Sequence, residues 1–254
     1  MIFVTGDIHG KPDRFYNNFY NNFYQGHELS KDDYVIVCGD FGCIWSGDPY
    51  EQVRLDRLEE LPFTLLFITG NHENYDIIES YPVSEWHGGK VQFIRPHVIH
   101  LMRGQVFDIE GKTFFTMGGA ECHDLWNGVL DPADPKFKLK CSTLLAEGEF
   151  FRVKGESWWP QEIPTEEDYE EGRKNLRAHG MKVDYVLSHC SPTKLQEELV
   201  PVLHHGEYPR NSLTDFLQEV SEKTEFRKWY FGHYHVNKTL GRYNVLYEKI
   251  ERIS

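Results

Sequence analysis

Residues 1–10 read MIFVTGDIHG, an apolar run that ends in a Gly-Asp pair, and this stretch sets the pattern for the fold. The same arrangement recurs at Tyr34–Cys38, which runs into Gly39-Asp40, and at Phe63–Ile68, which is followed by Gly70-Asn71. Short apolar runs bounded by glycine are typical of buried strands. We therefore expect three strands, each of which delivers a polar side chain to the loop that follows it.

The segments between these runs indicate helices. Asp13–Tyr24 repeats phenylalanine every four residues, and Tyr50–Leu61 places Val53, Leu55 and Leu58 among charged residues. Strands that alternate with helices are typical of a parallel sheet with helical crossovers. Such sheets carry their binding loops at the carboxyl ends of the strands, which is where all three motifs fall.

The pattern changes after residue 97. Val98–Met102, Gln105–Ile109 and Thr113–Met117 are short strand-like runs with tight turns, which predicts an antiparallel meander. Residues 124–164 are irregular and contain prolines and glycines, so we expect an insertion or a lid over the site there. Thr165 precedes a run of acidic residues and is expected to cap a helix.

Two more strands are expected near the C-terminus. Val183–Leu187 runs into Ser188-His189, and Arg227–Phe231 runs into Gly232-His233. Val236–Ile253 then indicates a closing hairpin that turns at Gly241. Because no linker interrupts the chain, we expect residues 1–254 to form a single domain.

Composition narrows the class of protein. The chain is 40% hydrophobic and 26% charged, with a formal net charge of −13 and five cysteines that form no CxxC pair. We expect a soluble, cytoplasmic protein without disulfides and without a membrane segment. The negative charge disfavours a broad nucleic-acid interface without excluding one, and it leaves room for a local cationic centre.

Five loops together predict a metal site. Each follows an expected buried strand and offers Asp, His or Asn: Gly6-Asp7-Ile8-His9, Gly39-Asp40, Gly70-Asn71-His72-Glu73, Ser188-His189 and Gly232-His233-Tyr234-His235. One such loop is a weak signal, whereas five at the ends of successive strands form a strong one. The chain has no GxSxG, HExxH, P-loop or GxGxxG motif, which argues against the rival mechanisms.

These motifs resemble those of the calcineurin-like metallophosphoesterase superfamily, which read D-x-H, G-D, G-N-H-[D/E], H and G-H-x-H. The resemblance spans residues 6–235 and implies an α/β fold, a four-layer α/β/β/α sandwich of two mixed β-sheets flanked by helices. It also implies two divalent ions. Carboxylate, imidazole and amide ligands suit Mn, Fe, Zn or Mg, of which we favour Mn.

The resemblance also implies a role for each residue. Asp7, His9 and His235 would hold one metal ion. Asn71, His189 and His233 would hold the other, and Asp40 would bridge the two. His72 matches the non-ligand histidine of the superfamily and would protonate the leaving group. A pair of cations lowers the pKa of a shared water, so the expected nucleophile is a metal-bridging hydroxide.

The substrate is less well defined. Ser/Thr protein phosphatases of the superfamily extend the second loop as G-D-x-V-D-R-G, whereas this chain has Gly39-Asp40-Phe41-Gly42-Cys43-Ile44-Trp45. A narrower resemblance, to bacterial and phage members, rests on residues 118–124, an arginine and residues 158–162. From it we take His123, Asp124 and Arg152 as candidate substrate-binding residues.

Three functions stay open from the sequence. The first is a phosphomonoesterase acting on a phosphorylated small molecule or a phosphoprotein. The second is a phosphodiesterase acting on cyclic nucleotides or nucleic-acid ends, because the same centre supports either reaction. The third, of another class, is a non-catalytic metal-binding scaffold. The sequence does not set the oligomeric state.

Overall fold

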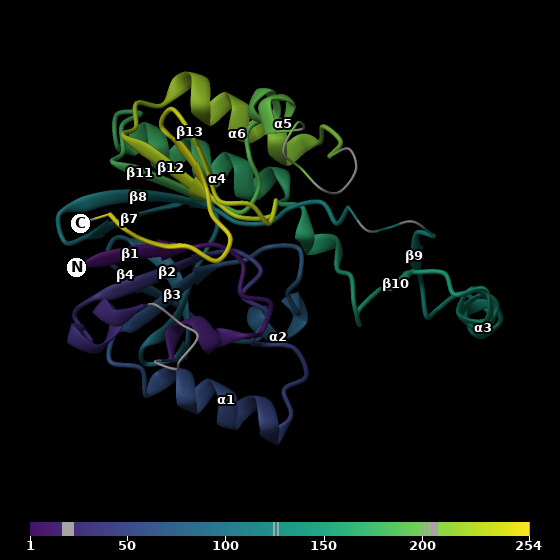
Figure 1. The fold of residues 1–254 in the computed structure, drawn as a ribbon. Coiled ribbons are helices and arrows are strands. Elements are labelled where there is room, and N and C mark those ends of the chain that lie inside the picture. The colour runs from purple at the N-terminus through teal and green to yellow at the C-terminus, as the bar shows by residue number, and fades with distance from the viewer. Residues whose placement is uncertain are drawn as a thin grey trace.

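The computed structural model describes residues 1–16, 23–123, 125, 127–199, 201, 203 and 208–253. Two large β-sheets lie face to face, and helices cover the outer face of each (Figure 1). This is the expected four-layer sandwich of two mixed sheets. None of the helices in the described ranges is long and apolar enough to cross a bilayer.

The first sheet has seven strands in the order β15-β1-β2-β3-β6-β5-β4. In that order the strands are Ile250–Arg252, Ile2–Thr5, Tyr34–Cys38, Thr64–Ile68, Val98–Leu101, Gly89–Arg95 and Val83–Trp86. β1, β2, β3 and β6 pair in parallel, as expected of strands joined by crossovers. β15 adds an antiparallel edge next to β1, so the two ends of the chain lie side by side (Figure 1).

The second sheet has six strands in the order β13-β14-β12-β11-β8-β7. In that order the strands are Lys238–Leu240, Tyr243–Val245, Lys228–Phe231, Tyr185–Ser188, Lys112–Met117 and Gln105–Ile109. β14, β12, β11 and β8 pair in parallel, whereas β13 and β7 are antiparallel edges. The hairpin expected near the C-terminus is present as β13 and β14, and it turns at Gly241 with a φ of 59°. It ends at Val245 and not at Ile253, because β15 joins the first sheet.

Alternation along the strands separates the hydrophobic layers. In β1, Ile2 and Val4 point into the core between the sheets together with Leu187 of β11. Phe3, between them, points to the opposite face and belongs to the same hydrophobic cluster as Leu55 of the helix α1 (Pro49–Glu59). A strand whose two faces are both buried reads as a continuous apolar run, which explains the sequence pattern.

Helices complete the outer layers. α1 (Pro49–Glu59) and α2 (Tyr75–Glu79) lie on the first sheet, and α4 (Glu166–Ala178), α5 (Thr193–Leu199) and α6 (Ser212–Lys223) lie on the second (Figure 1). The 3₁₀ helices η1, η2 and η3 span Pro12–Phe15, Tyr24–Glu28 and Pro160–Glu162. α4 begins as expected, because the Thr165 hydroxyl accepts the Asp168 amide in a capping box.

Three expectations about secondary structure were wrong. The run from Val98 is not one meander, because β6 belongs to the first sheet and β7 to the second. A continuous helix over 13–24 is excluded, since η1 ends at Phe15 and Tyr16 is extended; residues 17–22 lie outside the described ranges. In α1, Val53 is 53% exposed and does not join the core.

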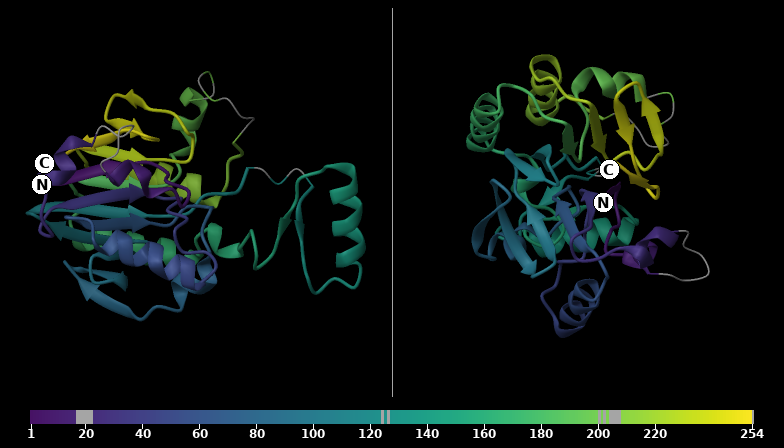
Figure 2. Two further views of the ribbon diagram at one scale, coloured as in Figure 1. Left: turned by 60° about the horizontal axis from the view of Figure 1, so that its bottom comes forward. Right: turned by 90° about the vertical axis from the view of Figure 1, so that its left-hand side faces the viewer.

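Residues 127–157 leave the body of the molecule, and we call them the arm. The arm contains the two-stranded parallel sheet of β9 (Val129–Leu130) and β10 (Arg152–Val153) and the helix α3 (Phe137–Glu147). Figures 1 and 2 show it standing away from both sheets. The chain rejoins the body at Trp159, which is buried and donates its indole N–H to Asp76 Oδ2 at 2.8 Å.

Candidate metal centre

Seven polar side chains from five loops meet where the central strands end. Their loops follow β1, β2, β3, β11 and β12, the five strands that the sequence motifs close. The residues are Asp7, His9, Asp40, Asn71, His189, His233 and His235. These are the seven residues that the sequence predicted as metal ligands.

The first group of donors surrounds Asp7. One ligand atom from each of Asp7, His9, Asp40 and His235 lies within 4.8 Å of the other three. His9 Nε2 is 2.9 Å from His235 Nε2, and His235 Nε2 is 3.2 Å from Asp7 Oδ2. Carboxylate and imidazole atoms this close can share one cation, and both are ligands that first-row divalent metals accept.

The second group surrounds His189. His189 Nε2 lies 3.2 Å from Asn71 Oδ1 and 3.3 Å from Asp40 Oδ1, and its ring centroid is 5.0 Å from that of His233. Asp40 Oδ2 is also 3.8 Å from His9 Nδ1 in the first group. Asp40 therefore stands between the two groups, with one oxygen toward each.

Both carboxylates are buried, and the basic side chains that lie against them are histidines. Asp7 is 0% exposed and Asp40 is 1% exposed, and within the described ranges neither side chain pairs with a lysine or an arginine. Asp7 accepts the His233 amide at 3.0 and 3.1 Å, and Asp40 Oδ1 accepts the His72 amide at 2.7 Å. Two buried carboxylates this close together are costly unless cations offset their charge, so this donor set fits bound cations.

Two of the histidines are in the protonation state that a metal ligand requires. Burial lowers the pKa of His233 well below its usual value and also lowers that of His9, so both rings are neutral near pH 7. A neutral imidazole keeps the lone pair that a metal needs.

His189 is held in one orientation by the backbone. Its Nδ1 lies 2.8 Å from the Cys38 carbonyl oxygen, to which only an N–H can donate, so Nε2 faces the carboxylates. Burial alone would lower the pKa of His189, but Asp40 and Asp7 raise it to about 9. Asp40 in turn has its pKa held well below the usual range by His189 and His72, against the effect of burial.

Several of the candidate ligands have a left-handed backbone conformation. Four of the seven residues have positive φ, an uncommon state outside glycine. They are His9 (46°), Asp40 (46°), His233 (68°) and His235 (51°). Such strain persists where surrounding structure enforces it and is concentrated at functional sites.

A glycine lets a ligand carboxylate lie against the backbone. A Cβ added at Gly232 would lie 1.9 Å from Asp7 Oδ1, and one added at Gly70 would lie 2.1 Å from Asp40 Oδ1. These contacts are too close for any side chain. Gly70, which precedes Asn71, is therefore required by the loop of Asp40. Gly232, which precedes His233, is required by the loop of Asp7.

Glu73 is a functional residue that sequence reasoning missed. It is fully buried and accepts three backbone amides, from Phe41 at 2.7 Å, Gly42 at 3.1 Å and Gly70 at 3.3 Å. Burial, aided by Asp40, raises the pKa of Glu73 to about 8 against the effect of these amides. Glu73 thus fixes the loop of Asp40 to that of Asn71, and its place in the third motif was the available signal.

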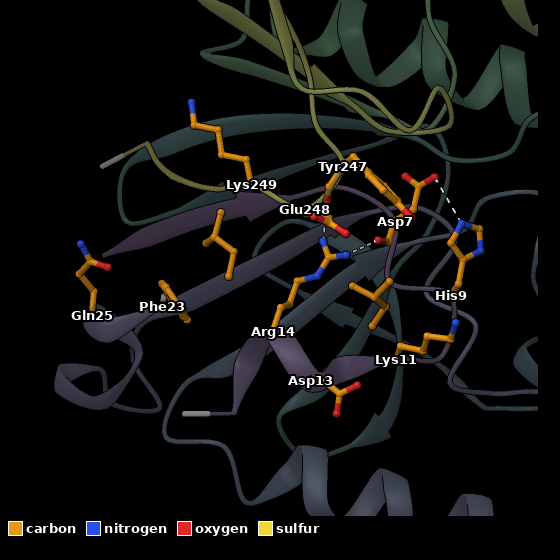
Figure 3. Close-up of a pocket in the computed structure, with 12 residues that line it drawn as sticks. Asp7, His9, Lys11, Asp13, Arg14, Phe23, Gln25, Tyr247, Glu248 and Lys249 are labelled. Atoms are coloured by element: carbon orange, nitrogen blue, oxygen red, sulfur yellow. Dashed lines mark hydrogen bonds and ion pairs between the residues drawn. The ribbon is translucent and has the colours of Figure 1, made fainter. Parts of the chain in front are cut away.

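Arg14 was also missed, and no sequence pattern marked it. Its guanidinium donates to Thr5 Oγ1 at 2.8 Å, to the Asp7 carbonyl at 2.7 Å and to the Tyr247 carbonyl at 2.6 Å. The Tyr247 ring stacks on His235 with centroids 4.6 Å apart. Arg14 therefore ties the loop after β1 to the C-terminal segment (Figure 3).

A cavity of about 750 Å³ opens beside the first donor group. Asp7, His9 and Lys11 lie at one end, whereas Phe23 and Gln25 lie at the other (Figure 3). This volume is within the range of small-molecule sites, roughly 300–1,000 Å³. The site is thus accessible from solvent on the side of Arg14 and Tyr247.

The other candidate residues differ in position. His72 is half-buried, and its ring lies edge-on to His9 with centroids 5.2 Å apart. The His123 ring lies 5.3 Å from that of His233 and 5.0 Å from that of Tyr208. Asp124 lies outside the described residues. The structure does not bring Arg152 to this cluster, because β10 leaves the body with the arm (Figure 1).

The chain was compared with family models, with curated proteins and with solved structures. The model of the family described as calcineurin-like phosphoesterase matches residues 1–237. No curated protein matches the chain. The phosphopantetheinyl hydrolase from Mycobacterium tuberculosis is 17% identical and superposes with a TM-score of 0.45 over 97% of this chain and 89% of that one. A putative 5′-nucleotidase from Staphylococcus aureus is 15% identical, with a TM-score of 0.44 over 97% of this chain and 48% of that one.

Proposed function

We propose, from the premise that this chain belongs to the calcineurin-like phosphoesterase family, that it is a phosphomonoesterase with a centre of two divalent cations. Membership itself makes the chain a metal-dependent phosphoric ester hydrolase. The number of ions, their identity and the substrate class are the proposed part.

The position of Asp40 carries the proposal. Its two oxygens face different donor groups, at 3.3 Å from His189 and 3.8 Å from His9. Asp7, His9 and His235 would hold one cation, and Asn71, His189 and His233 would hold the other. Nitrogen and oxygen donors without thiolate suit Mn²⁺, which we propose as the native metal.

The chemistry divides between the ions and the protein. Two cations, when bound, would polarise a phosphoryl oxygen and would supply a hydroxide at neutral pH. The protein orients its ligands through Glu73, Arg14 and the Cys38 carbonyl. Asn71 Nδ2 is buried and has no hydrogen-bond partner in the described part of the chain, so it is available to donate to a phosphate oxygen.

His72 is placed to protonate the leaving oxygen. Its amide is held by Asp40 Oδ1, and its ring is half-buried beside His9. An imidazole suits this role because its usual pKa lies near neutrality. A monoester leaves as an alkoxide that needs this proton, and the cavity next to His9 can hold its organic part.

The proposed substrate is a small phosphorylated molecule, and the proposed location of the protein is a reducing compartment. All five cysteines are free thiols, which supports a cytoplasmic location. The net charge of −13 disfavours a nucleic-acid substrate.

Paired substrates test the proposal. Protein loaded with Mn²⁺ should hydrolyse p-nitrophenyl phosphate with a higher kcat/KM than bis-p-nitrophenyl phosphate. Chelation should abolish both activities, and Mn²⁺ should restore them. Faster turnover of the diester would identify a phosphodiesterase instead, and no turnover with any divalent metal would leave a non-catalytic scaffold.

A further inference from the structure

The helix of the arm has no buried residue. α3 is 11 residues long, and the structure shows it apart from both sheets (Figure 2). Three of the six large apolar side chains that are exposed in the described ranges lie in the arm: Leu139 at 65%, Leu145 at 68% and Phe150 at 72%. Isolated helices of this length are marginal in water, so a covering surface is needed to stabilise it.

The two faces of α3 differ. Phe137, Cys141 and Leu144 are half-buried and share the face toward β9. The opposite face presents four exposed, uncharged residues, Leu139, Ser142, Thr143 and Ala146. The Ser142 hydroxyl donates to the Leu139 carbonyl at 2.9 Å, so its hydrogen bond is satisfied within the helix. The outer face can therefore be covered without leaving that hydroxyl unsatisfied.

The charges on α3 run against its own dipole. Lys136, Lys138 and Lys140 lie at its beginning, and Glu147 is its last residue. The first turn has no acidic residue, the last turn has no basic one, and the side chain at the N-cap makes no hydrogen bond. A helix dipole favours the opposite arrangement, so these charges are unfavourable to the helix when it is alone. Within the arm, Asp134 Oδ2 lies 2.7 Å from Lys140 Nζ and offsets part of this charge.

The same charges are complementary in an antiparallel pair. We propose that α3 is a dimerisation surface whose occupant is α3 of a second copy of this chain. Lys140 and Glu147 are seven residues apart and lie on the same flank of the helix. In a twofold pair centred between Thr143 and Leu144, each Lys140 lies beside Glu147 of the other copy. The two helix dipoles are then antiparallel as well, which favours the pair.

The charge of the whole chain supports contact through the arms. Residues 129–153 hold four basic and four acidic side chains, whereas the chain carries −13. The arm projects from the body (Figure 2). Bodies of like charge repel each other, and a contact between two arms would keep the two bodies apart. Two helices of this length bury less than the roughly 1,600 Å² of a standard interface, so the dimer is weak and concentration-dependent.

Charge reversal tests the pairing in the intact protein. The dimer dissociation constant is measured by sedimentation velocity for the wild type, Lys140→Glu, Glu147→Lys and the double variant. Each single reversal creates two like-charge contacts between the copies and should weaken the dimer about tenfold. Lys140→Glu also breaks the ion pair with Asp134 inside the arm, so the result for Glu147→Lys is compared with it. The double variant should restore it. Lys174→Glu, on the exposed side of α4, serves as the matched control and should change nothing.

Mixing the two single variants is the decisive step. When a Lys140→Glu chain pairs with a Glu147→Lys chain, each of the two contacts joins an acidic and a basic side chain. The mixture should therefore form a heterodimer that is tighter than the homodimer of either variant. Leu139→Ser should weaken the dimer without changing any charge. Circular dichroism and hydrolysis of p-nitrophenyl phosphate should be unchanged in every variant, because Leu139, Lys140 and Glu147 lie in the arm and Lys174 is exposed on the outer side of α4. A wild type that stays monomeric, a dimer insensitive to charge reversal or a mixture without heterodimer would each overturn the proposal.

Discussion

The strand-end loops and the arm depart in opposite ways from the usual burial of apolar and polar side chains. At the loops, Asp7 and Asp40 are fully buried polar groups surrounded by histidines and backbone amides. In the arm, Leu139 and Leu145 are apolar groups that the rest of the described chain does not cover. The first region buries charge that bound cations would stabilise, and the second exposes apolar surface that another molecule would stabilise. Both departures from ordinary burial point to a missing partner.

The largest effect should come from the residue between the two donor groups. Asp40→Asn keeps the shape of the side chain but removes the charge shared by both, so kcat/KM for p-nitrophenyl phosphate should fall by at least about 10³-fold. Metal content, measured on the same samples, should fall with it. Asp56→Asn, on the surface of α1, is the matched control and should retain both. Normal activity of the Asp40→Asn protein would show that Asp40 does not belong to the catalytic centre.

The second prediction separates proton transfer from metal binding. His72→Ala should lower kcat about 10²- to 10⁴-fold for an alkyl phosphate, because its leaving alkoxide needs a proton. The loss should be smaller for p-nitrophenyl phosphate, whose leaving group is a weak base. Metal content should not change, whereas His189→Ala should reduce it. Equal losses on the two substrates would contradict the role of His72 as a proton donor.

Substitution of leucine by alanine should lower the free energy of unfolding by different amounts in the two regions. Leu66→Ala in β3 opens a cavity in the core between the sheets and should lower the free energy of unfolding by about 2–5 kcal/mol. Leu139→Ala in α3 should change it by less than about 0.5 kcal/mol, because that side chain is exposed. Chemical denaturation at low protein concentration gives both values. Similar costs would show that the arm packs against the body.

The smallest effect is expected at Arg152. Because β10 lies in the arm, Arg152→Ala should leave kcat/KM for p-nitrophenyl phosphate within about twofold, the range of a surface change. Arg14→Ala is the informative contrast, since Arg14 ties Asp7 to Tyr247. A large loss at Arg152 would instead support the sequence-based expectation that this residue contacts the substrate.

The sequence indicated which residues the fold gathers at the candidate metal centre, because this signal is local. Each of Asp7, Asp40 and His189 directly follows a short apolar strand, and parallel strands present their carboxyl ends at one edge. Glu73 and Arg14 could not be assigned in the same way. Their roles depend on amides and carbonyls of other loops, whose positions only the fold defines.

The fold was predicted less completely at its edges. β4 and β5 carried no signal strong enough to separate them from loops. β4 has no buried position, and the apolar residues of β5 are interrupted by Lys90 and Gln92. β6 and β7 were joined into one meander because Met102–Gly104 has the composition of a turn, although the chain there crosses between sheets. α3 has no buried residue, so it lacked the periodicity that marks helices of the body.

The central claim is that five loops build one site for two cations. Crystals grown with Mn²⁺ and measured at the manganese absorption edge test it most directly. The anomalous difference map should show two peaks about 3.5–4 Å apart, both in contact with Asp40. One should lie against Asp7, His9 and His235, and the other against Asn71, His189 and His233. A single peak, or peaks away from Asp40, would contradict the claim.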